Sequence, residues 1–193
     1  MTELTTVERQ EADRRNLRWA LWANLLMFLV GLVGWRLAQS AALLADALDM
    51  LADASGYLVA YLAVRGGAGH QRLAAKWNGA MLIVLGLGIF VEVAHRWTGG
   101  AEPVGGLIMA FACLSLLVNG LVLRVLSKYR NSPEGYLRAT WVDTRADVLV
   151  NVGVLVSGAL VAVTGYRLVD LIASGILAIF VIHEGWELLE EDD

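Results

Sequence analysis

Cysteine, proline and charged residues are scarce in this chain of 193 residues. A single cysteine, Cys113, excludes an intrachain disulfide, and the low number of prolines, two, excludes a collagen-like or proline-rich disordered chain. Charged residues make up 18% of the sequence, against about a quarter in soluble domains, and the net charge is −4. The chain therefore fits neither a soluble domain nor a nucleic-acid-binding protein, which would carry a basic face.

Hydrophobic residues make up 58% of the chain and form six long stretches. A transmembrane helix needs roughly 20 mainly apolar residues. We place six such helices at 18–38, 42–64, 77–97, 104–126, 137–164 and 168–186. The breaks between them are short, so neighbouring helices should be antiparallel. We predict an all-α membrane protein with a cytoplasmic segment 1–15, a six-helix transmembrane domain 16–188 and an acidic cytoplasmic tail 189–193.

The distribution of Lys and Arg predicts how these helices are oriented. Eleven of these residues lie near the N-terminus, between the second and third stretches, or between the fourth and fifth, whereas three lie on the opposite side. Because basic residues are retained on the cytoplasmic side, both termini should be cytoplasmic. We expect the chain in the plasma (inner) membrane of a prokaryote.

Two of the stretches carry aspartates, which are costly inside a membrane. The second stretch contains Asp49 and Asp53, and the fifth contains Asp143 and Asp147. Each pair has the spacing Asp-x-x-x-Asp, which places both carboxylates one turn apart on the same helix face. If the two helices face each other, four carboxylates converge. In the alternative interpretation, the aspartates pair with Arg145 or line a polar seam between helices.

Two further charged residues accompany these pairs. Asp46, one turn before Asp49, is interpreted either as a hydrogen-bonding partner of the ligands or as a packing residue near the entrance. Arg145 lies about 200° from Asp143 around the helix, so it should snorkel or pair with another carboxylate rather than contact a metal.

Four carboxylates in an apolar interior cannot all remain ionised without a counter-charge. A divalent cation supplies that charge, and protons supply it when the cation leaves. Oxygen ligands suit Mg²⁺, Mn²⁺ and Fe²⁺, although carboxylates also bind Zn²⁺. The pattern therefore predicts a site that exchanges metal for protons.

The two halves of the chain show a weak internal repeat. Asp49 and Asp143 are 94 positions apart, and Asn24 and Asn119 are 95 apart, each on the stretch before an aspartate pair. This spacing indicates two three-helix halves with the site at their interface, an arrangement common in transporters.

These motifs resemble those of the cation diffusion facilitator family of metal-ion/proton antiporters. Residues 40–53, SAALLADALDMLAD, are similar to the family's second-helix pattern Leu-Ala-Asp-Ala-x-His/Asp-x-x-x-Asp, and residues 143–154, DTRADVLVNVGV, are similar to its fifth helix. By this resemblance the four transport-site ligands are Asp49, Asp53, Asp143 and Asp147. Asp46 and Asn151 are then expected beside the ligands or at the entrance to the site.

The chain departs from the family pattern in two respects. The family commonly carries His at the position of Asp143 and often at that of Asp49, so the all-Asp set is similar to members associated with manganese. Family members also usually continue into a cytoplasmic αβ domain that binds metal and helps to dimerise, whereas this sequence stops shortly after Trp186. We expect a short form without that domain, for which a homodimer remains the family expectation.

We predict a divalent transition-metal efflux transporter for Mn²⁺, Fe²⁺ or Zn²⁺ that exchanges the ion for protons by alternating access. It should need no cofactor, and its partners should be the ion, protons and the lipid bilayer, with no nucleic acid. Two alternatives are a metal-dependent enzyme of the phosphatidyltransferase type and a non-transporting scaffold. Against the enzyme alternative, the sequence contains no Asp-Gly dipeptide, which such enzymes require. The three histidines, His70, His95 and His183, are expected to be exposed rather than ligands.

Overall fold

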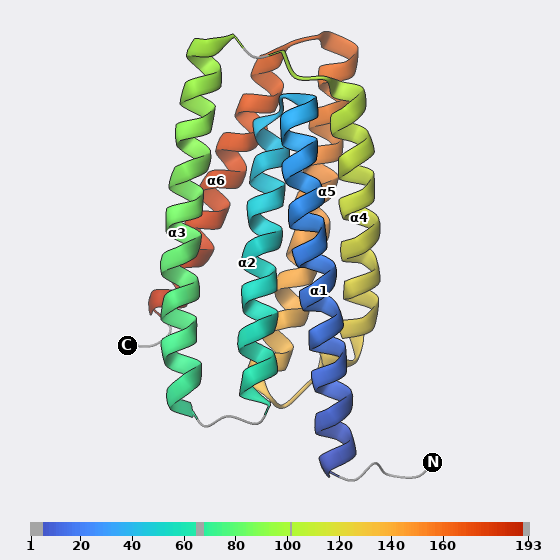
Figure 1. Ribbon diagram of the computed structural model, residues 1–193, viewed down its shortest axis with the longest axis vertical. Helices are drawn as coiled ribbons and strands as arrows, with labels where there is room; N and C mark the ends of the chain where they lie inside the picture. Colours follow the sequence, from blue (N-terminus) through green and yellow to red (C-terminus); the bar gives the residue numbers. More distant parts are fainter. Residues whose placement is uncertain (1–5, 65–67, 101, 191–193) are drawn as a thin grey trace.

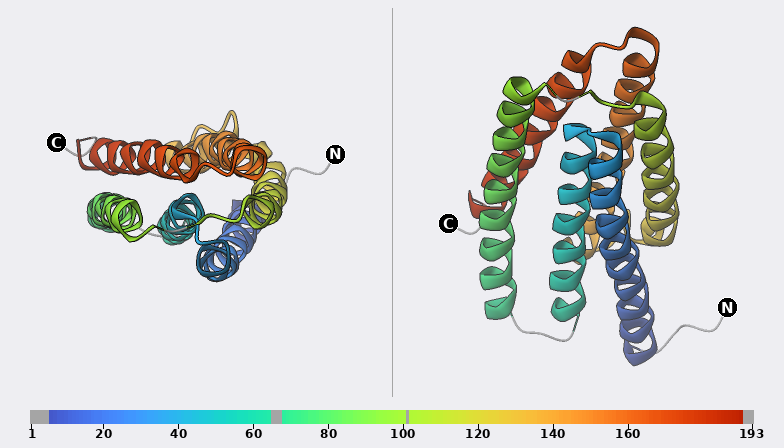
Figure 2. Two further views of the ribbon diagram at one scale, coloured as in Figure 1. Left: turned by 90° about the horizontal axis from the view of Figure 1, so that it is seen from above. Right: turned by 45° about the horizontal axis from the view of Figure 1, so that its top comes forward.

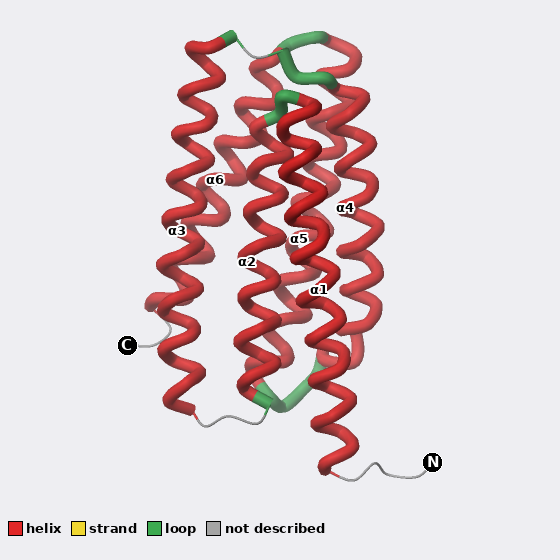
Figure 3. Tube along the Cα trace, viewed as in Figure 1, coloured by secondary structure: helices red, strands yellow, loops and turns green. Residues whose placement is uncertain are grey.

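The computed structural model describes residues 6–64, 68–100 and 102–190, and these segments contain helices and loops but no β-strand (Figure 3). The six α-helices are α1 (Thr6–Ala38), α2 (Ala41–Ala63), α3 (Ala68–Gly99), α4 (Gly105–Leu126), α5 (Gly135–Thr164) and α6 (Arg167–Glu190). A 3₁₀ turn, η1 (Ser127–Tyr129), follows α4. The predicted all-α class is confirmed for the described residues.

The helices coincide with the six predicted stretches, but two of them extend well beyond their apolar part. α1 begins at Thr6 and α3 at Ala68. The break predicted between 42–64 and 77–97 is therefore wrong from Ala68 onward, because Ala, Gln, Arg, Leu and Lys are good helix formers that extend the helix beyond its apolar part. His70 lies on this helical extension rather than in a loop, and its side chain is outside the described part. α5 ends, as predicted, before Gly165, whose φ of +67° is a conformation that glycine adopts readily.

Five of the six helices, all except α2, are long and apolar enough to cross a membrane. α2 is also long enough, since its 23 residues span about 34 Å, but it carries Asp46, Asp49 and Asp53. α2 packs against α1, α3, α5 and α6, so other helices separate its charged residues from lipid. That all six helices span the membrane stays a prediction.

The helices pack mainly as the pairs α1 with α2, α3 with α6, and α4 with α5. Figure 1 shows α1 and α2 side by side, with α3 at the left edge and α4 at the right. Seen from above in Figure 2, α5 and α6 lie along one side of the molecule, opposite α1, α2 and α3. Because α1 also contacts α4 and α2 contacts α5, the helices α1, α2, α4 and α5 form a closed ring around a common interior.

Two apolar clusters fill the ends of this four-helix ring. The upper cluster, named for the view in Figure 1, consists of Ala38, Ala42, Leu43, Ile108, Ala112, Val154 and Val161. The lower cluster consists of Leu17, Ala20, Tyr57, Ala60, Val64, Val122, Leu126, Tyr129 and Leu137. Each cluster draws residues from all four helices of the ring. The candidate site lies in the interval between them.

Candidate metal-transport site

Between the upper and lower clusters, the buried faces of α1, α2, α4 and α5 carry polar side chains. We call this layer the polar belt. Its buried members are Asn24, Asp46, Asp49, Ser115, Asn119, Thr144, Asp147 and Asn151. Burial of so many polar groups between two apolar layers is costly unless they bind one another or a ligand. The polar belt is therefore the candidate functional site.

A hydrogen bond between α2 and α5 sets the register of their aspartates. The Tyr57 hydroxyl lies 2.6 Å from Thr144 Oγ1, which itself donates to the carbonyl oxygen of Thr140. Because a hydroxyl has one hydrogen to donate, Tyr57 is the donor in the bond to Thr144. Helical side chains lean toward the N-terminus of their helix, so the Tyr57 hydroxyl reaches up the bundle toward Asp53. Asp147 lies almost one turn above Thr144, in the same part of the interior.

The four predicted ligands share this region but differ in exposure. Asp49 and Asp147 are buried, with 7% and 2% of their surface exposed. Asp53 is half-buried and Asp143 is exposed. The Tyr57 hydroxyl interacts electrostatically with Asp53, Asp143 and Asp147, and Asp143 in turn interacts with Asp49. The four aspartates are thus linked by electrostatic interactions: three of them interact with Tyr57, and the fourth, Asp49, interacts with Asp143.

The four carboxylates do not close onto a single point. Within the described residues, no three Asp, Glu, His or Cys side chains come close enough together to hold a metal ion. Asp46, which also interacts electrostatically with Asp49, accepts a hydrogen bond of 2.8 Å from Ser115 on α4. Ser115 therefore holds Asp46 against α4, beside the predicted ligands.

Three asparagines of the polar belt have an unsatisfied oxygen. The Oδ1 atoms of Asn24, Asn119 and Asn151 are buried and accept no hydrogen bond within the described part of the chain. Each buried acceptor left in this way costs about 1–3 kcal/mol. Such groups are rare in native proteins and call for an explanation, of which a bound ligand is one.

Sequence reasoning missed several members of this site. The internal repeat drew attention to Asn24 and Asn119 without assigning them to the site, and Ser115, Tyr57 and Thr144 were not singled out. A signal was present in their spacing. Tyr57 follows Asp53 by four residues and Thr144 precedes Asp147 by three, which places each on the face of its neighbouring aspartate.

The residues that were expected to lie away from the site do so where the structure describes them. Arg145 is exposed, and its guanidinium lies 5.8 Å from the centre of the Trp141 ring. His95 is exposed on α3, and the exposed His183 lies 3.5 Å from Glu187 on α6. Neither histidine belongs to the polar belt.

Comparison with known proteins shows what the chain as a whole is similar to. The model of a protein family described as the cation efflux transmembrane domain matches residues 17–192. The zinc transporter ZitB of Yersinia pestis is 28% identical over 200 residues, which cover 97% of this chain and 64% of the relative. ZitB of Escherichia coli strain K12 is 30% identical over 194 residues, covering 94% of this chain and 62% of the relative.

A third relative carries a broader name. The cadmium, cobalt and zinc/H(+)-K(+) antiporter of Bacillus subtilis strain 168 is 27% identical over 176 residues, covering 84% of this chain and 57% of the relative. The chain thus spans between 57% and 64% of the length of these curated relatives. The transmembrane-domain match, the bacterial relatives and the apolar helices make it an integral protein of a bacterial inner membrane, as predicted.

Proposed function

This chain belongs to the cation efflux family, and we propose that it transports divalent metal cations out of the cytoplasm in exchange for protons. The family is one of transporters rather than enzymes, in agreement with the predicted transport class. The observation that carries the proposal is the buried aspartate set of the polar belt. Asp49 and Asp147 lie between two apolar clusters, where an uncompensated charge is costly and a cation or a proton compensates it.

In this proposal Asp49, Asp53, Asp143 and Asp147 bind the ion. Asp46, held by Ser115, and Asn151 act from beside these ligands and position them. A carboxylate must lose its proton before it binds metal, and it takes up a proton when the metal leaves. The same four groups therefore couple metal movement in one direction to proton movement in the other.

Alternating access follows from the two apolar clusters. With both clusters packed, the polar belt is closed from above and below. Loosening of the lower cluster would admit an ion from the cytoplasm, and loosening of the upper cluster would release it outward. Because the four carboxylates are not closed on one point, completing the ion site requires the aspartates of α2 and α5 to approach one another.

The proposed substrates are Mn²⁺, Fe²⁺ and Zn²⁺. The oxygen-only ligand set suits the first two, and carboxylates also bind Zn²⁺. The names of the relatives specify zinc, cadmium and cobalt, so Cd²⁺ and Co²⁺ belong in any test. The proposed transport unit is the six-span domain 16–188 with both chain ends cytoplasmic, including the tail 189–193, and with a homodimer as its assembly.

Transport assays in proteoliposomes test this function. Purified protein is reconstituted with a pH dye inside the vesicles, and MnCl₂, FeCl₂, ZnCl₂, CdCl₂ or CoCl₂ is added outside. We expect at least one ion to enter while protons leave. Asp147→Ala and Asp53→Ala remove proposed ligands and should reduce both fluxes by at least about 100-fold, the upper end of the losses seen when residues that only support metal ligands are removed.

Glu102→Gln provides the matched control because it removes an exposed carboxylate from the loop between α3 and α4, far from the polar belt. It should transport like the wild type. All variants should elute as the wild type does in size-exclusion chromatography. Full flux in both aspartate variants would show that the site is misassigned, and a wild type that moves no protons with any of the five ions would rule out proton exchange.

A further inference from the structure

Asn24 on α1 presents an amide oxygen to the interior of the polar belt. Its side chain is fully buried, and its Nδ2 donates to the carbonyl oxygen of Ala20 at 3.1 Å. A carbonyl oxygen accepts only from the NH₂ group of the amide, so this bond fixes which end of the amide is which. Ala20 belongs to the lower cluster, one turn below. Oδ1 therefore points away from that backbone bond, and it has no partner within the described residues.

Asn119 on α4 repeats this situation on the neighbouring helix of the ring. It is 1% exposed, and its Oδ1 also accepts no hydrogen bond within the described residues. Ser115, one turn above Asn119 on the same face, donates to Asp46 of α2. Val122, almost one turn below, belongs to the lower cluster. The face of α4 that carries Asn119 is therefore the face that meets the aspartate helix.

The two asparagines lie at the same height in the bundle. Asn24 lies one turn above Ala20 and Asn119 almost one turn above Val122, and both of these apolar residues pack in the lower cluster with Tyr57. α1 and α4 also contact each other directly, and the Val104 amide donates to the Ala38 carbonyl at 2.9 Å at their upper ends. Two unsatisfied oxygens thus enter the polar belt from the two helices that contribute no aspartate to it.

We propose that the side-chain oxygens of Asn24 and Asn119 are further ligands of the transported ion and favour Mn²⁺ over Zn²⁺. This inference rests on the proposed function. Four carboxylates and two amides together supply six oxygen donors, the number that octahedral Mn²⁺ takes, whereas tetrahedral Zn²⁺ needs four. Amides are neutral and do not titrate, so they add coordination without changing the number of protons exchanged.

The substitutions Asn24→Leu and Asn119→Leu test the inference because leucine keeps the branched shape of asparagine at Cγ, with a somewhat larger volume, and removes the oxygen. Each full-length variant is purified in detergent, and its thermal midpoint is measured without metal and across titrations of MnCl₂ and of ZnCl₂. We expect the half-saturating Mn²⁺ concentration to rise about tenfold, the lower end of the effect of supporting residues at metal sites. The value for Zn²⁺ should change little. The metal-free midpoint should not fall, because an unsatisfied buried acceptor is replaced by an apolar group.

Asn131→Ala, at an exposed position after η1, is the matched control and should behave as the wild type in both titrations. If a leucine variant does not fold, Asn24→Ala and Asn119→Ala repeat the measurement without adding volume. A lower metal-free midpoint with an unchanged ratio of Mn²⁺ to Zn²⁺ half-saturation would show that the amides are structural and overturn the inference.

The aspartate variants keep the two proposals distinguishable. If Asp147→Ala abolishes flux while the asparagine variants keep the wild-type ratio of Mn²⁺ to Zn²⁺, the ligand role of the amides is wrong and the transport function stands. If Asp147→Ala and Asp53→Ala both transport fully, the proposed site is wrong, and the amide inference falls with it.

Discussion

Close packing between α1 and α2 depends on the absence of a side chain at Gly31. A Cβ atom added there would lie 2.7 Å from Ala47 Cβ and 3.2 Å from Ala47 Cα. Ala47 lies between Asp46 and Asp49, so this contact supports the backbone that carries two polar-belt aspartates. In membrane proteins the hydrophobic effect contributes little to the association of helices, so close packing matters. Small residues at helix contacts allow the backbones to approach closely.

We predict that Gly31→Ala destabilises the folded protein by about 1–3 kcal/mol, the usual cost of overpacking. The added methyl group would displace the backbone of α2 at Ala47, because it would lie too close to both the Cβ and the Cα atoms of that residue. Unfolding in mixed detergent micelles, followed by circular dichroism, measures the change.

Gly120→Ala on α4 is the comparison for this prediction, since a Cβ there meets nothing within 4 Å. It should leave stability unchanged or raise it by up to about 1 kcal/mol through better helix propensity. Equal effects of the two substitutions would mean that the Gly31 contact does not limit the packing of α1 on α2.

At the scale of helices, polar contacts near the chain reversals link segments that are distant in the sequence. At the lower end, Asp13 of α1 accepts hydrogen bonds from Lys128 at 2.7 Å and from Tyr129 at 2.9 Å. At the upper end, Trp35 of α1 donates to Glu92 of α3 at 2.8 Å, and Glu92 also pairs with Arg96. These bonds tie α1 to the connection after α4 and to α3.

The N-terminus of α2 is capped from another helix. Ser40 is its N-cap and accepts from the Leu43 amide, and the buried carboxylate of Asp170 on α6 accepts from the Ser40 hydroxyl and, at 2.8 Å, from the Ala41 amide. A negative charge is favourable at a helix N-terminus, where amide groups lack partners inside the helix. The cap therefore links α6 to the helix that carries Asp46, Asp49 and Asp53.

We predict that Asp170→Ala lowers the free energy of unfolding by about 2 kcal/mol, the size of hydrogen bonds to a charged group. Ser40→Ala should cost about 1 kcal/mol as a lost N-cap. Because the two side chains share a hydrogen bond, the double variant should lose at least about 0.5 kcal/mol less than the sum of the single losses. Thermal unfolding of the four proteins measures this coupling, and strictly additive losses would contradict the shared cap.

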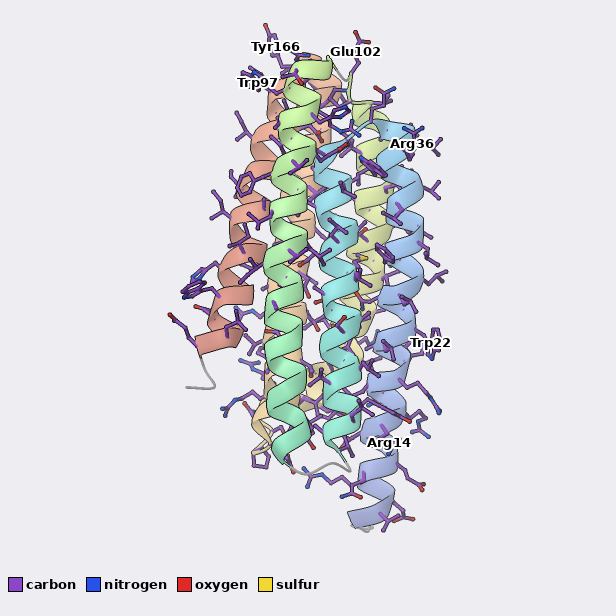
Figure 4. All side chains as sticks on the ribbon, turned by 60° about the vertical axis from the view of Figure 1, so that its left-hand side comes forward. Arg14, Trp22, Arg36, Trp97, Glu102 and Tyr166 are labelled. Carbon is purple, nitrogen blue, oxygen red and sulfur yellow. The ribbon has the colours of Figure 1, made fainter. Side chains whose placement is uncertain are left out.

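At the scale of the whole molecule, exposed aromatic and charged side chains mark two opposite ends. Figure 4 shows Arg36, Trp97, Glu102 and Tyr166 near the upper end of the bundle, while Arg14 lies toward the lower end. Trp97 and Tyr166 are exposed, as expected of amphipathic rings at a membrane interface. Most of the basic residues that predict a cytoplasmic side lie on the lower turns of α1, α3, α4 and α5 or in the connection from α4 to α5.

We predict that the upper end faces outward. In a Cys113→Ser background, a membrane-impermeant maleimide should label Glu102→Cys in intact cells, because Glu102 lies in the connection above α3 and α4. Arg130→Cys, in the connection below α4, should be labelled only after the membrane is permeabilised. Labelling of Arg130→Cys in intact cells would reverse the proposed orientation.

Much of the architecture could be predicted from the sequence, and for a local reason. A helix is held by hydrogen bonds between residues four positions apart, so apolar stretches and breaks such as Gly165 reveal where helices lie. The start of α3 was missed because its first turns are polar, and hydropathy does not distinguish a polar helix from a loop. The aspartate pairs were evident because charge in an apolar helix is costly and therefore conspicuous.

What the sequence determined by itself was the helical class, the order of the six helices and the presence of paired carboxylates within them. The tertiary structure alone decided which polar groups meet. Tyr57 bonds Thr144 across 87 positions, Ser115 bonds Asp46 across 69, and Asp170 caps Ala41 across 129. It also left the oxygens of Asn24 and Asn119 unsatisfied between two apolar clusters. Such contacts depend on how helix faces pack in space, and no periodicity within a single helix specifies its partner.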